Sequence, residues 1–168
     1  MSGGRQDGTV VCPGSYDPVT NGHLDVISRA ARVFDKVVVG VVNNPVRKEK
    51  TLFTAEERKA FIEEATAELP NVEVEIFSNL LVEFARDNDA TAIVKGLRAI
   101  SDFEYEFEMA QLNRKLDPSI ESIYMIASPQ YSFLSSTGVK EMATFGGDVS
   151  DLVPTPVAAA MAERLPSR

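Results

Sequence analysis

The strongest constraint on the fold is an alternation of two kinds of segment along the chain. Short apolar runs rich in β-branched residues, typical of buried strands, are each followed by a longer segment with helical periodicity. The predicted strands are Thr9–Cys12, Val37–Val42, Val72–Phe77, Thr91–Val94 and Ser122–Ala127. Strands that alternate with helices in this way pair in parallel, and helices cover both faces of their sheet. We therefore expect an α/β fold, a doubly wound (Rossmann-like) domain with a five-stranded parallel sheet.

Start signals for several of the predicted helices can be read from the sequence. The helices are expected near residues 22–34, 54–69, 80–88, 102–116, 136–145 and 156–165. Two starts have the spacing of a capping box, in which Glu follows a hydroxyl residue by three positions: Thr54 with Glu57, and Ser101 with Glu104. Thr155 followed by Pro156 suits an N-cap and the first helical position.

The segment DFEYEFEM, residues 102–109, supports two interpretations. It alternates charged and apolar residues with period two, which taken alone is typical of a half-buried strand. The start signal before it and the helix formers in the following MAQLNRKL favour a helix, which we predict. Phe103 and Phe107, at i, i+4 spacing, are then expected in the core. The acidic residues expected on a solvated face are Asp102, Glu104 and Glu108.

Chain length and composition indicate a single globular domain. A chain of 168 residues with 44% apolar and 25% charged residues is ordinary for one domain, which we place at 9–168 behind a flexible tail of residues 1–8. No apolar run approaches the length of a membrane span, and the N-terminal MSGGRQDG lacks the apolar core of a signal peptide. We therefore expect a cytoplasmic protein with no membrane partner.

The single cysteine and the acidic net charge argue against further classes of function. Cys12 alone provides neither a disulfide framework nor a cysteine-based metal site, and it is expected as a small buried apolar residue. A net charge of -8 argues against nucleic-acid binding, which depends on broad cationic surfaces. Any anionic ligand must then be met by cations gathered locally.

Polar and cationic residues follow each predicted strand. The loops concerned are PGSYDPVTNGH, NNPVRKEK, SNLL, KGLRAISD and SPQYSFLSSTGVK. Open parallel sheets bind ligands beyond the carboxyl ends of their strands, so these loops should face one crevice. The P-loop pattern G-x-x-x-x-G-K-[ST] is absent, which excludes that class. No G-x-G-x-x-G follows the first strand, which weakens the case for dinucleotide binding.

The only histidine of the chain lies at the start of the first predicted helix. Thr20 or Asn21 is expected to cap that helix, which puts His23 in its first turn. Free backbone N–H groups and the positive end of the helix dipole favour an anion there, and His23 could donate to a phosphate oxygen. Gly22 permits a ligand to approach closely. A purely structural role, in which His23 only helps to cap the helix, also explains its position.

Later loops carry groups that suit the same kind of ligand. Lys95 and Arg98 flank Gly96, so that two cations could converge on a phosphate. The motif SSTGVK stacks three hydroxyls at an expected helix start, and none has Glu or Gln three residues beyond it, so they are not committed to a capping box. Each of these signals is weak when taken alone. Asp17 and Pro18 are expected only to form a turn.

Together, these motifs resemble those of the phosphopantetheine adenylyltransferases. That family consists of bacterial enzymes of coenzyme A synthesis, within the nucleotidyltransferase superfamily that shares a T/H-x-G-H signature with class I aminoacyl-tRNA synthetases. The resemblance runs from about Val10 to Leu165. It rests on PGSYDPVTNGH, KGLRAISDFEYE, NR at 113–114, YSFLSSTGVKE and GGDV, which occur in the family's order and approximate spacing. A lone NGH is weak evidence, whereas five ordered motifs are specific.

The resemblance implies a reaction and its requirements. Members of the family transfer the adenylyl group of ATP to 4'-phosphopantetheine, giving dephospho-coenzyme A and pyrophosphate, by in-line attack without a covalent enzyme intermediate. Catalysis then depends on positioning and charge stabilisation. Mg2+ is expected with ATP, held mainly by phosphates and water rather than by protein ligands. A homo-oligomer is expected, because the family is usually hexameric.

Matching motifs carry the family's site residues over to this chain. His23 is expected to bind the nucleotide phosphates and to stabilise the transition state, with Ser15 between the two substrates. The other residues expected to bind ATP are Tyr16 (through its backbone), Gly96, Leu97, Arg98, Glu106, Tyr131, Ser132, Phe133, Leu134, Ser135, Ser136 and Thr137. The residues expected to bind phosphopantetheine are Ser15, Arg47, Leu81 and Lys95.

The chain departs from the family pattern at a few positions. The family often has a lysine in a segment like NPSKK after the second strand, where this chain has Arg47 followed by Lys48. Arginine keeps the charge but presents a planar fork in place of a point donor, so either residue could take that contact. Thr137 stands where serine is frequent, and Ser15 and Tyr16 stand where Thr and Phe are also common. These changes preserve the hydroxyl or the ring.

Two other functions stay open on the sequence. A sister nucleotidyltransferase that moves AMP or CMP to another phosphate would keep the NGH element and the SST loop, and the acceptor-side residues Arg47, Leu81 and Lys95 argue against it. A nucleotide-sensing or assembly protein would be favoured if His23 were absent or Lys95 neutral, and neither holds. An RNA-binding role, suggested by the synthetase kinship, is disfavoured by the acidic net charge.

Overall fold

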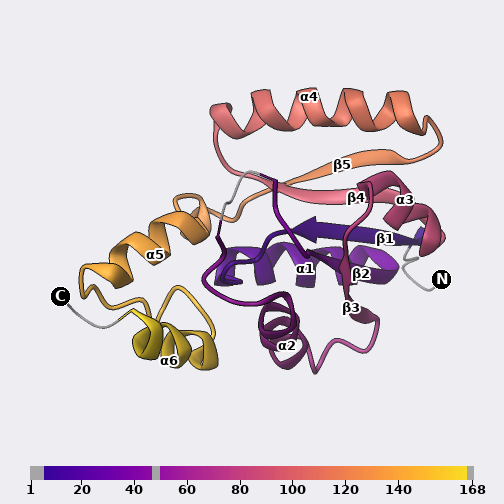
Figure 1. The fold of residues 1–168 in the computed structure, drawn as a ribbon. Coiled ribbons are helices and arrows are strands. Elements are labelled where there is room, and N and C mark those ends of the chain that lie inside the picture. Colours follow the sequence, from indigo (N-terminus) through magenta and orange to yellow (C-terminus); the bar gives the residue numbers. More distant parts are fainter. Residues whose placement is uncertain (1–5, 47–49, 166–168) are drawn as a thin grey trace.

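A sheet of five parallel strands forms the centre of the molecule (Figure 1). The computed structural model describes residues 6–46 and 50–165. The strands are β1 (Gln6–Gly14), β2 (Phe34–Val42), β3 (Val72–Phe77), β4 (Ala90–Leu97) and β5 (Glu121–Ile126). They lie in the order β3-β2-β1-β4-β5, and every neighbouring pair is parallel. The predicted doubly wound parallel sheet is confirmed.

Helices cover both faces of the sheet, because apolar side chains point to alternate faces along each strand. The α-helices are α1 (Asn21–Val33), α2 (Ala55–Ala65), α3 (Leu81–Asp87), α4 (Ile100–Leu116), α5 (Ser136–Thr144) and α6 (Thr155–Arg164), with a short 3-10 helix at Pro129–Tyr131. Val10 packs in a core cluster with residues of α1, α2, α5 and α6. Val11, the next residue, packs in a second cluster with residues of α3. The long helix α4 runs along β4 and β5 (Figure 1).

β1 and β4 are neighbours in the sheet although two strands separate them in the chain. From β1 the chain adds β2 and β3 on one side, and it then returns to add β4 and β5 on the other side. The connections after β1 and β4 therefore leave the sheet in opposite directions and open a crevice at the carboxyl ends of these strands. This is the crevice expected from the sequence.

Strands β1, β2 and β4 each extend beyond a predicted end by two residues or more. β1 begins at Gln6, which pairs with Phe34, three residues before the predicted start. Of the predicted flexible tail, residues 1–5 lie outside the described residues. β4 continues to Leu97, so Lys95 lies inside a strand rather than in the loop that was expected. Pairing with β5 holds this part of the chain in extended conformation.

The predicted helix starts have different outcomes. The capping box of α2 is confirmed: the Glu57 N–H donates to Thr54 Oγ1 over 3.2 Å, and the Thr54 N–H donates to Glu57 Oε2 over 2.8 Å. The predicted cap at Ser101 is wrong, because α4 begins directly after Ala99, whose side chain accepts no hydrogen bond. α6 begins at Thr155 itself, one residue earlier than expected.

The segment 102–109 is helical as predicted, but the prediction that Phe103 and Phe107 are core residues is wrong. Their side chains are 52% and 54% exposed, and Leu112 and Leu116 farther along α4 are also about half exposed. The i, i+4 spacing correctly places the two phenyl rings on one side of the helix. Spacing does not say which side of a helix faces the sheet, and here the apolar side faces outward.

Candidate active site

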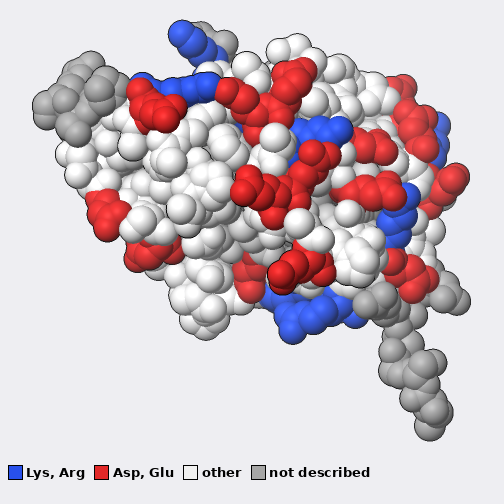
Figure 2. Space-filling model, turned by 90° about the horizontal axis from the view of Figure 1, so that it is seen from below, with Lys and Arg blue, Asp and Glu red and all other residues white. Residues whose placement is uncertain are grey.

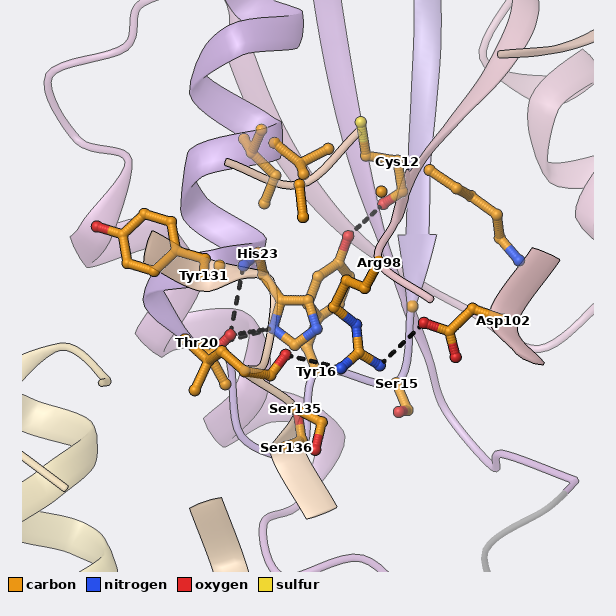
Figure 3. Close-up of a pocket in the computed structure, with 18 of the residues that line it drawn as sticks. Cys12, Ser15, Tyr16, Thr20, His23, Arg98, Asp102, Tyr131, Ser135 and Ser136 are labelled. Atoms are coloured by element: carbon orange, nitrogen blue, oxygen red, sulfur yellow. Dashed lines mark hydrogen bonds and ion pairs between the residues drawn. The ribbon is translucent and has the colours of Figure 1, made fainter. Parts of the chain in front are cut away.

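The crevice between the ends of β1 and β4 contains a cavity of about 430 Å³ (Figure 3). Five parts of the chain line it: the end of β1 with the following loop, the first two turns of α1, the end of β4, the start of α4, and the segment that leads into α5. The predicted site residues among its lining are Ser15, Tyr16, His23, Lys95, Gly96, Arg98, Glu106, Tyr131, Leu134, Ser135, Ser136 and Thr137. Loops far apart in the sequence thus converge where the topology places a ligand.

His23 lies in the first turn of α1 and takes part in its cap. Thr20 is the N-cap: the His23 N–H donates to Thr20 Oγ1 over 3.3 Å, and the Thr20 N–H donates to His23 Nδ1 over 3.0 Å (Figure 3). Because a backbone N–H can only donate, Nδ1 must be an acceptor, and the proton of the neutral ring is on Nε2. The cap therefore selects the tautomer in which His23 has an Nε2–H donor, so the structural role and a chemical role are compatible.

Tyr16 holds the imidazole of His23 from one side. Its ring meets the His23 ring edge-on, with the centroids 5.0 Å apart, and its hydroxyl donates to the Cys12 carbonyl over 2.9 Å. A Cβ on Gly14 would lie 3.0 Å from the Tyr16 ring, so the ring also needs a glycine there. Tyr16 has a φ of 50°, a left-handed conformation that is uncommon for an aromatic residue. The Tyr16 side chain is buried and its hydroxyl is bonded within the chain. A ligand would therefore contact the backbone of Tyr16 rather than its side chain.

Burial makes two groups beside the pocket resistant to ionisation. Burial raises the pKa of the Cys12 thiol to about 12, so Cys12 is not a reactive thiolate at neutral pH. Burial also raises the pKa of Tyr16, and the neighbouring Cys12 adds to that shift. The prediction that Cys12 is a small buried residue is confirmed.

Lys95 and Glu106 form an ion pair across the pocket wall. Lys95 Nζ lies 2.9 Å and 3.2 Å from the two carboxylate oxygens of Glu106, and both side chains are largely buried. The Tyr124 hydroxyl donates to the Glu106 carbonyl over 3.0 Å, which fixes this turn of α4 against β5. Two residues that the family resemblance assigned to different substrates are therefore in contact.

Arg98 joins the end of β4 to the segment before α5. Its guanidinium donates to the Leu134 carbonyl over 2.9 Å and pairs with the Asp102 carboxylate at 3.4 Å (Figure 3). Asp102 was expected on a solvated helix face, and that prediction is wrong because the side chain lines the pocket. Its position four residues after a site arginine is the sequence signal that would have found it.

Two of the three hydroxyls of the SSTGVK motif have partners within the chain. Ser135 is the N-cap of α5 and accepts from the Gly138 N–H over 3.0 Å. The Ser136 hydroxyl donates to the Pro18 carbonyl over 2.8 Å, so that proton is not free for a ligand. The first turn of α5 nevertheless lines the pocket, as does the first turn of α1. Two helix N-termini, with their positive dipole ends, thus face one cavity.

The acidic net charge of the chain is visible on its surface. Acidic side chains are spread over the face seen in Figure 2, with fewer basic ones between them.

The charges of the pocket differ from the prediction that two cations, Lys95 and Arg98, converge on a phosphate. Within the described lining, Lys95 and Arg98 are each paired with a carboxylate, Glu106 and Asp102. The formal charges of these four side chains cancel, so the helix N-termini supply much of the attraction for an anion.

Several predicted site residues lie away from this cavity. Leu97, Ser132 and Phe133 are not part of its described lining, and Phe133 is 70% exposed. Leu81 begins α3 and packs against the second core cluster. Arg47 and the alternative Lys48 lie outside the described residues. The roles assigned to these residues stay predictions.

Sequence reasoning missed two buried charged residues next to the pocket. Asp17 and Arg58 have 0% and 1% of their surface exposed. Asp17 does lie in the expected turn, but its carboxylate also binds Lys140 of α5 and two backbone N–H groups. Arg58 looks like an ordinary polar residue of an amphipathic helix, so no signal in a single sequence distinguishes it.

Two further kinds of feature are absent from the described residues. No group of three or more His, Cys, Asp or Glu side chains in these ranges is arranged to hold a metal ion. None of the helices described is long and apolar enough to cross a membrane.

Comparison with known proteins identifies the family. The model of the cytidylyltransferase-like family matches residues 11–142. A phosphopantetheine adenylyltransferase of Clostridium tetani is 55% identical over 144 residues, covering 86% of this chain and 89% of that protein. One of Caldanaerobacter subterraneus subsp. tengcongensis is 51% identical over 154 residues, covering 92% and 95%. The chain is thus cytidylyltransferase-like in class, and within that class it belongs to the phosphopantetheine adenylyltransferase family.

The fold is found in solved structures as well. A crystal structure from Vibrio parahaemolyticus, assigned as a nicotinate-nucleotide adenylyltransferase, superposes with a TM-score of 0.65 over 92% of this chain and 91% of that one. Its sequence is only 15% identical, so this likeness concerns the fold alone. The relatives described above, rather than this structure, confirm the family predicted from the motifs.

Proposed function

We propose that the chain transfers the adenylyl group of ATP to 4'-phosphopantetheine, which gives dephospho-coenzyme A and pyrophosphate. The observation that carries this proposal is His23, held by the α1 cap as an Nε2–H donor in a cavity that two helix N-termini face. Membership of the phosphopantetheine adenylyltransferase family supports the same reaction.

In the proposed reaction an oxygen of the acceptor phosphate attacks the α-phosphorus of ATP. A new P–O bond forms as the bond from the α-phosphorus to the bridging oxygen breaks, and pyrophosphate leaves with that oxygen and the electron pair. Negative charge rises on the oxygens around the reacting phosphorus, where the Nε2–H of His23 would donate. The Cys12 thiol, buried with a raised pKa, provides no thiolate nucleophile, and attack without a covalent enzyme intermediate is what the family resemblance implies.

Two groups of residues serve the two substrates in this proposal. ATP is bound by the backbone of Tyr16 and by Gly96, Leu97, Arg98, Glu106 and the segment 131–137. The acceptor is bound by Arg47, Leu81 and Lys95, and Ser15 lies between the substrates. Because Lys95 is paired with Glu106, the acceptor phosphate would compete with that carboxylate for its ammonium.

Mg2+ accompanies ATP in this proposal and supplies charge neutralisation to the phosphates. The carboxylates in the described lining, Asp102 and Glu106, are each paired with a cation. This donor set fits a metal held mainly by phosphates and water, which suits the reluctance of Mg2+ to lose its water.

We further propose that the protein acts in the cytoplasm as a homo-oligomer, a hexamer as the family resemblance implies. The observation that supports self-association is the exposed apolar side of α4, where Phe103 and Phe107 are more than half exposed. Apolar patches of this kind mark association surfaces in soluble proteins.

Pyrophosphate release from ATP and Mg2+ tests the proposed reaction, with 4'-phosphopantetheine, nicotinamide mononucleotide and glycerol 3-phosphate offered separately. We expect release with 4'-phosphopantetheine alone. Release with another acceptor alone would keep the nucleotide site and overturn the substrate. Absence of release with all three, while ATP still binds, would favour a nucleotide-sensing protein.

A further inference from the structure

We infer that Arg58 is a positioning residue for the active site: from α2, outside the pocket, it holds the Ser15 carbonyl in place. This inference rests on the proposed function, in which Ser15 lies between the two substrates. The Arg58 guanidinium donates to the Ser15 carbonyl over 2.7 Å and is almost completely buried. Arg58 is not part of the pocket lining, so it acts only through the residues it holds.

Arg58 also donates to three further backbone carbonyls. The acceptors are the carbonyl oxygens of Val42 at 2.8 Å, Asn43 at 3.1 Å and Phe53 at 3.1 Å. Val42 and Asn43 lie at the carboxyl end of β2, Ser15 follows β1, and Phe53 precedes α2. One side chain therefore joins the ends of two neighbouring strands to the start of a helix.

The chemistry of the guanidinium explains why arginine occupies this position. A buried cation is costly unless its donors are satisfied, and four carbonyl oxygens converge on this one. Burial lowers the pKa of Arg58, and the nearby Asp17 carboxylate opposes that shift. A lysine would keep the charge, but its point-like ammonium could not bridge carbonyls spread over the planar fork.

Asp17 strengthens the same connection from the other side of the loop. Its carboxylate accepts from the Leu52 and Phe53 N–H groups, each over 2.9 Å, and pairs with Lys140 of α5 at 3.1 Å. The loop after β1 is thus tied at Ser15 and at Asp17 to the segment before α2. Ser15 cannot shift without breaking contacts to β2, to α2 or to both.

Arg58→Lys is the variant that tests this inference, with Ile62→Val as the matched control. Ile62 is also on α2, one turn beyond Arg58 and fully buried, and its side chain packs in the core without a contact to the Ser15 carbonyl. Both variants should lower the melting temperature. We expect Arg58→Lys to lower kcat by about tenfold or more, because small displacements of a reacting group are costly. KM for ATP should change less than kcat, since most of the proposed nucleotide contacts, at residues 96–98, Glu106 and 131–137, lie outside this loop.

Amide hydrogen exchange gives a readout that does not depend on the acceptor. We expect Arg58→Lys to speed exchange about tenfold in peptides covering residues 12–17 and 42–46, and to leave a peptide covering β4 unchanged. Ile62→Val should not speed exchange in the peptides covering residues 12–17 and 42–46. If the wild-type chain released no pyrophosphate, the proposed function would fail, and this comparison would still decide the role of Arg58.

Several outcomes would overturn the inference. One is an Arg58→Lys variant with wild-type kcat and wild-type exchange at residues 12–17. A second is an Ile62→Val variant that loses as much kcat at the same loss of melting temperature. A third is an Arg58→Lys variant that stays unfolded even at low temperature in sucrose, which favours the compact state; Arg58 would then be a folding determinant.

Discussion

Helices α2 and α4 reverse the usual distribution of charged and apolar side chains in opposite ways. On α2 a charged residue, Arg58, is 1% exposed, whereas on α4 two apolar residues, Phe103 and Phe107, are more than half exposed. The partners of the first exception are seen in the structure, and that of the second is proposed. The partners of Arg58 are backbone carbonyls inside the chain, and the partner proposed for the phenyl rings is a second copy of the chain.

The difference shows that burial follows the partners of a side chain rather than its polarity alone. α2 packs beside strand ends whose carbonyl groups need donors, and a guanidinium satisfies four of them. α4 lies on the outer part of the sheet, along its edge strand β5. We propose that the exposed apolar surface there serves association between chains rather than the core of one chain.

Replacing the buried charge should have the largest effect on stability. Arg58→Met leaves four carbonyls without their donor, and we expect it to cost about 3 kcal/mol or more of unfolding free energy. Arg32→Met, at an exposed arginine on α1, is the control and should change the unfolding free energy by less than about 0.5 kcal/mol. Denaturant unfolding measures both. Equal effects of the two substitutions would show that the contacts of Arg58 contribute little.

Placing a charge on the apolar side of α4 should break the assembly and leave the monomer folded. Phe107→Glu puts a carboxylate where the proposed interface is apolar, so light scattering should give a smaller mass, while the helical circular dichroism signal is retained. Val33→Glu, at an exposed apolar residue at the end of α1, is the matched control. A wild-type protein that is already monomeric would contradict the proposed assembly.

Helices α2 and α4 also differ in how their N-termini are capped, and substitutions there should have smaller effects on stability. The start of α2 has a capping box, whereas the N-cap of α4, Ala99, makes no side-chain hydrogen bond. We expect Ala99→Ser to raise the unfolding free energy by about 0.5–1 kcal/mol and Thr54→Ala to lower it by about 1 kcal/mol. Denaturant midpoints measure both, and a loss of stability in Ala99→Ser would contradict this account of the α4 start.

The smallest expected effect concerns the pH dependence of the α2 start. Hydrogen bonds from Arg164 and from the Thr54 N–H lower the pKa of Glu57 from its ordinary 4.5. A lowered folded-state pKa stabilises the protein above pH 4.5, and this stabilisation is lost as the pH falls through the folded-state value. Because both partners are about one third exposed, we expect less than about 1 kcal/mol.

Glu57→Gln isolates that charge, because glutamine can keep the capping box. The difference in unfolding free energy between the wild type and Glu57→Gln should shrink between pH 6 and pH 3. A difference that stays constant over this range would show that the charge of Glu57 makes no contribution.

The sequence predicts the features of this molecule that depend on local pattern. The alternation of strands and helices, the caps at Thr20 or Asn21 and at Thr54, and the convergence of loops on one crevice all follow from spacing and residue type. The order of motifs was sufficient to predict the family. These features are set by neighbours in the sequence or by general rules of parallel sheets.

Features that depend on distant partners could not be predicted from one sequence. The outward side of α4 depends on how that helix is rotated against β4 and β5, which the spacing of Phe103 and Phe107 does not contain. The contacts of Arg58 join residues 15, 42, 43 and 53, and no local pattern marks them. The ion pair of Lys95 with Glu106 likewise depends on the packing of α4 beside β4.

The most direct test of the central claim separates the two roles of His23. His23→Ala removes the Nδ1 acceptor of the α1 capping box together with the Nε2–H donor, whereas His23→Glu restores an acceptor for the Thr20 N–H without an N–H donor. We predict that His23→Ala lowers kcat by about a hundredfold or more, and that His23→Glu recovers stability but not kcat. A loss of kcat below about threefold in folded His23→Ala, or recovery of kcat in His23→Glu, would show that His23 only caps the helix.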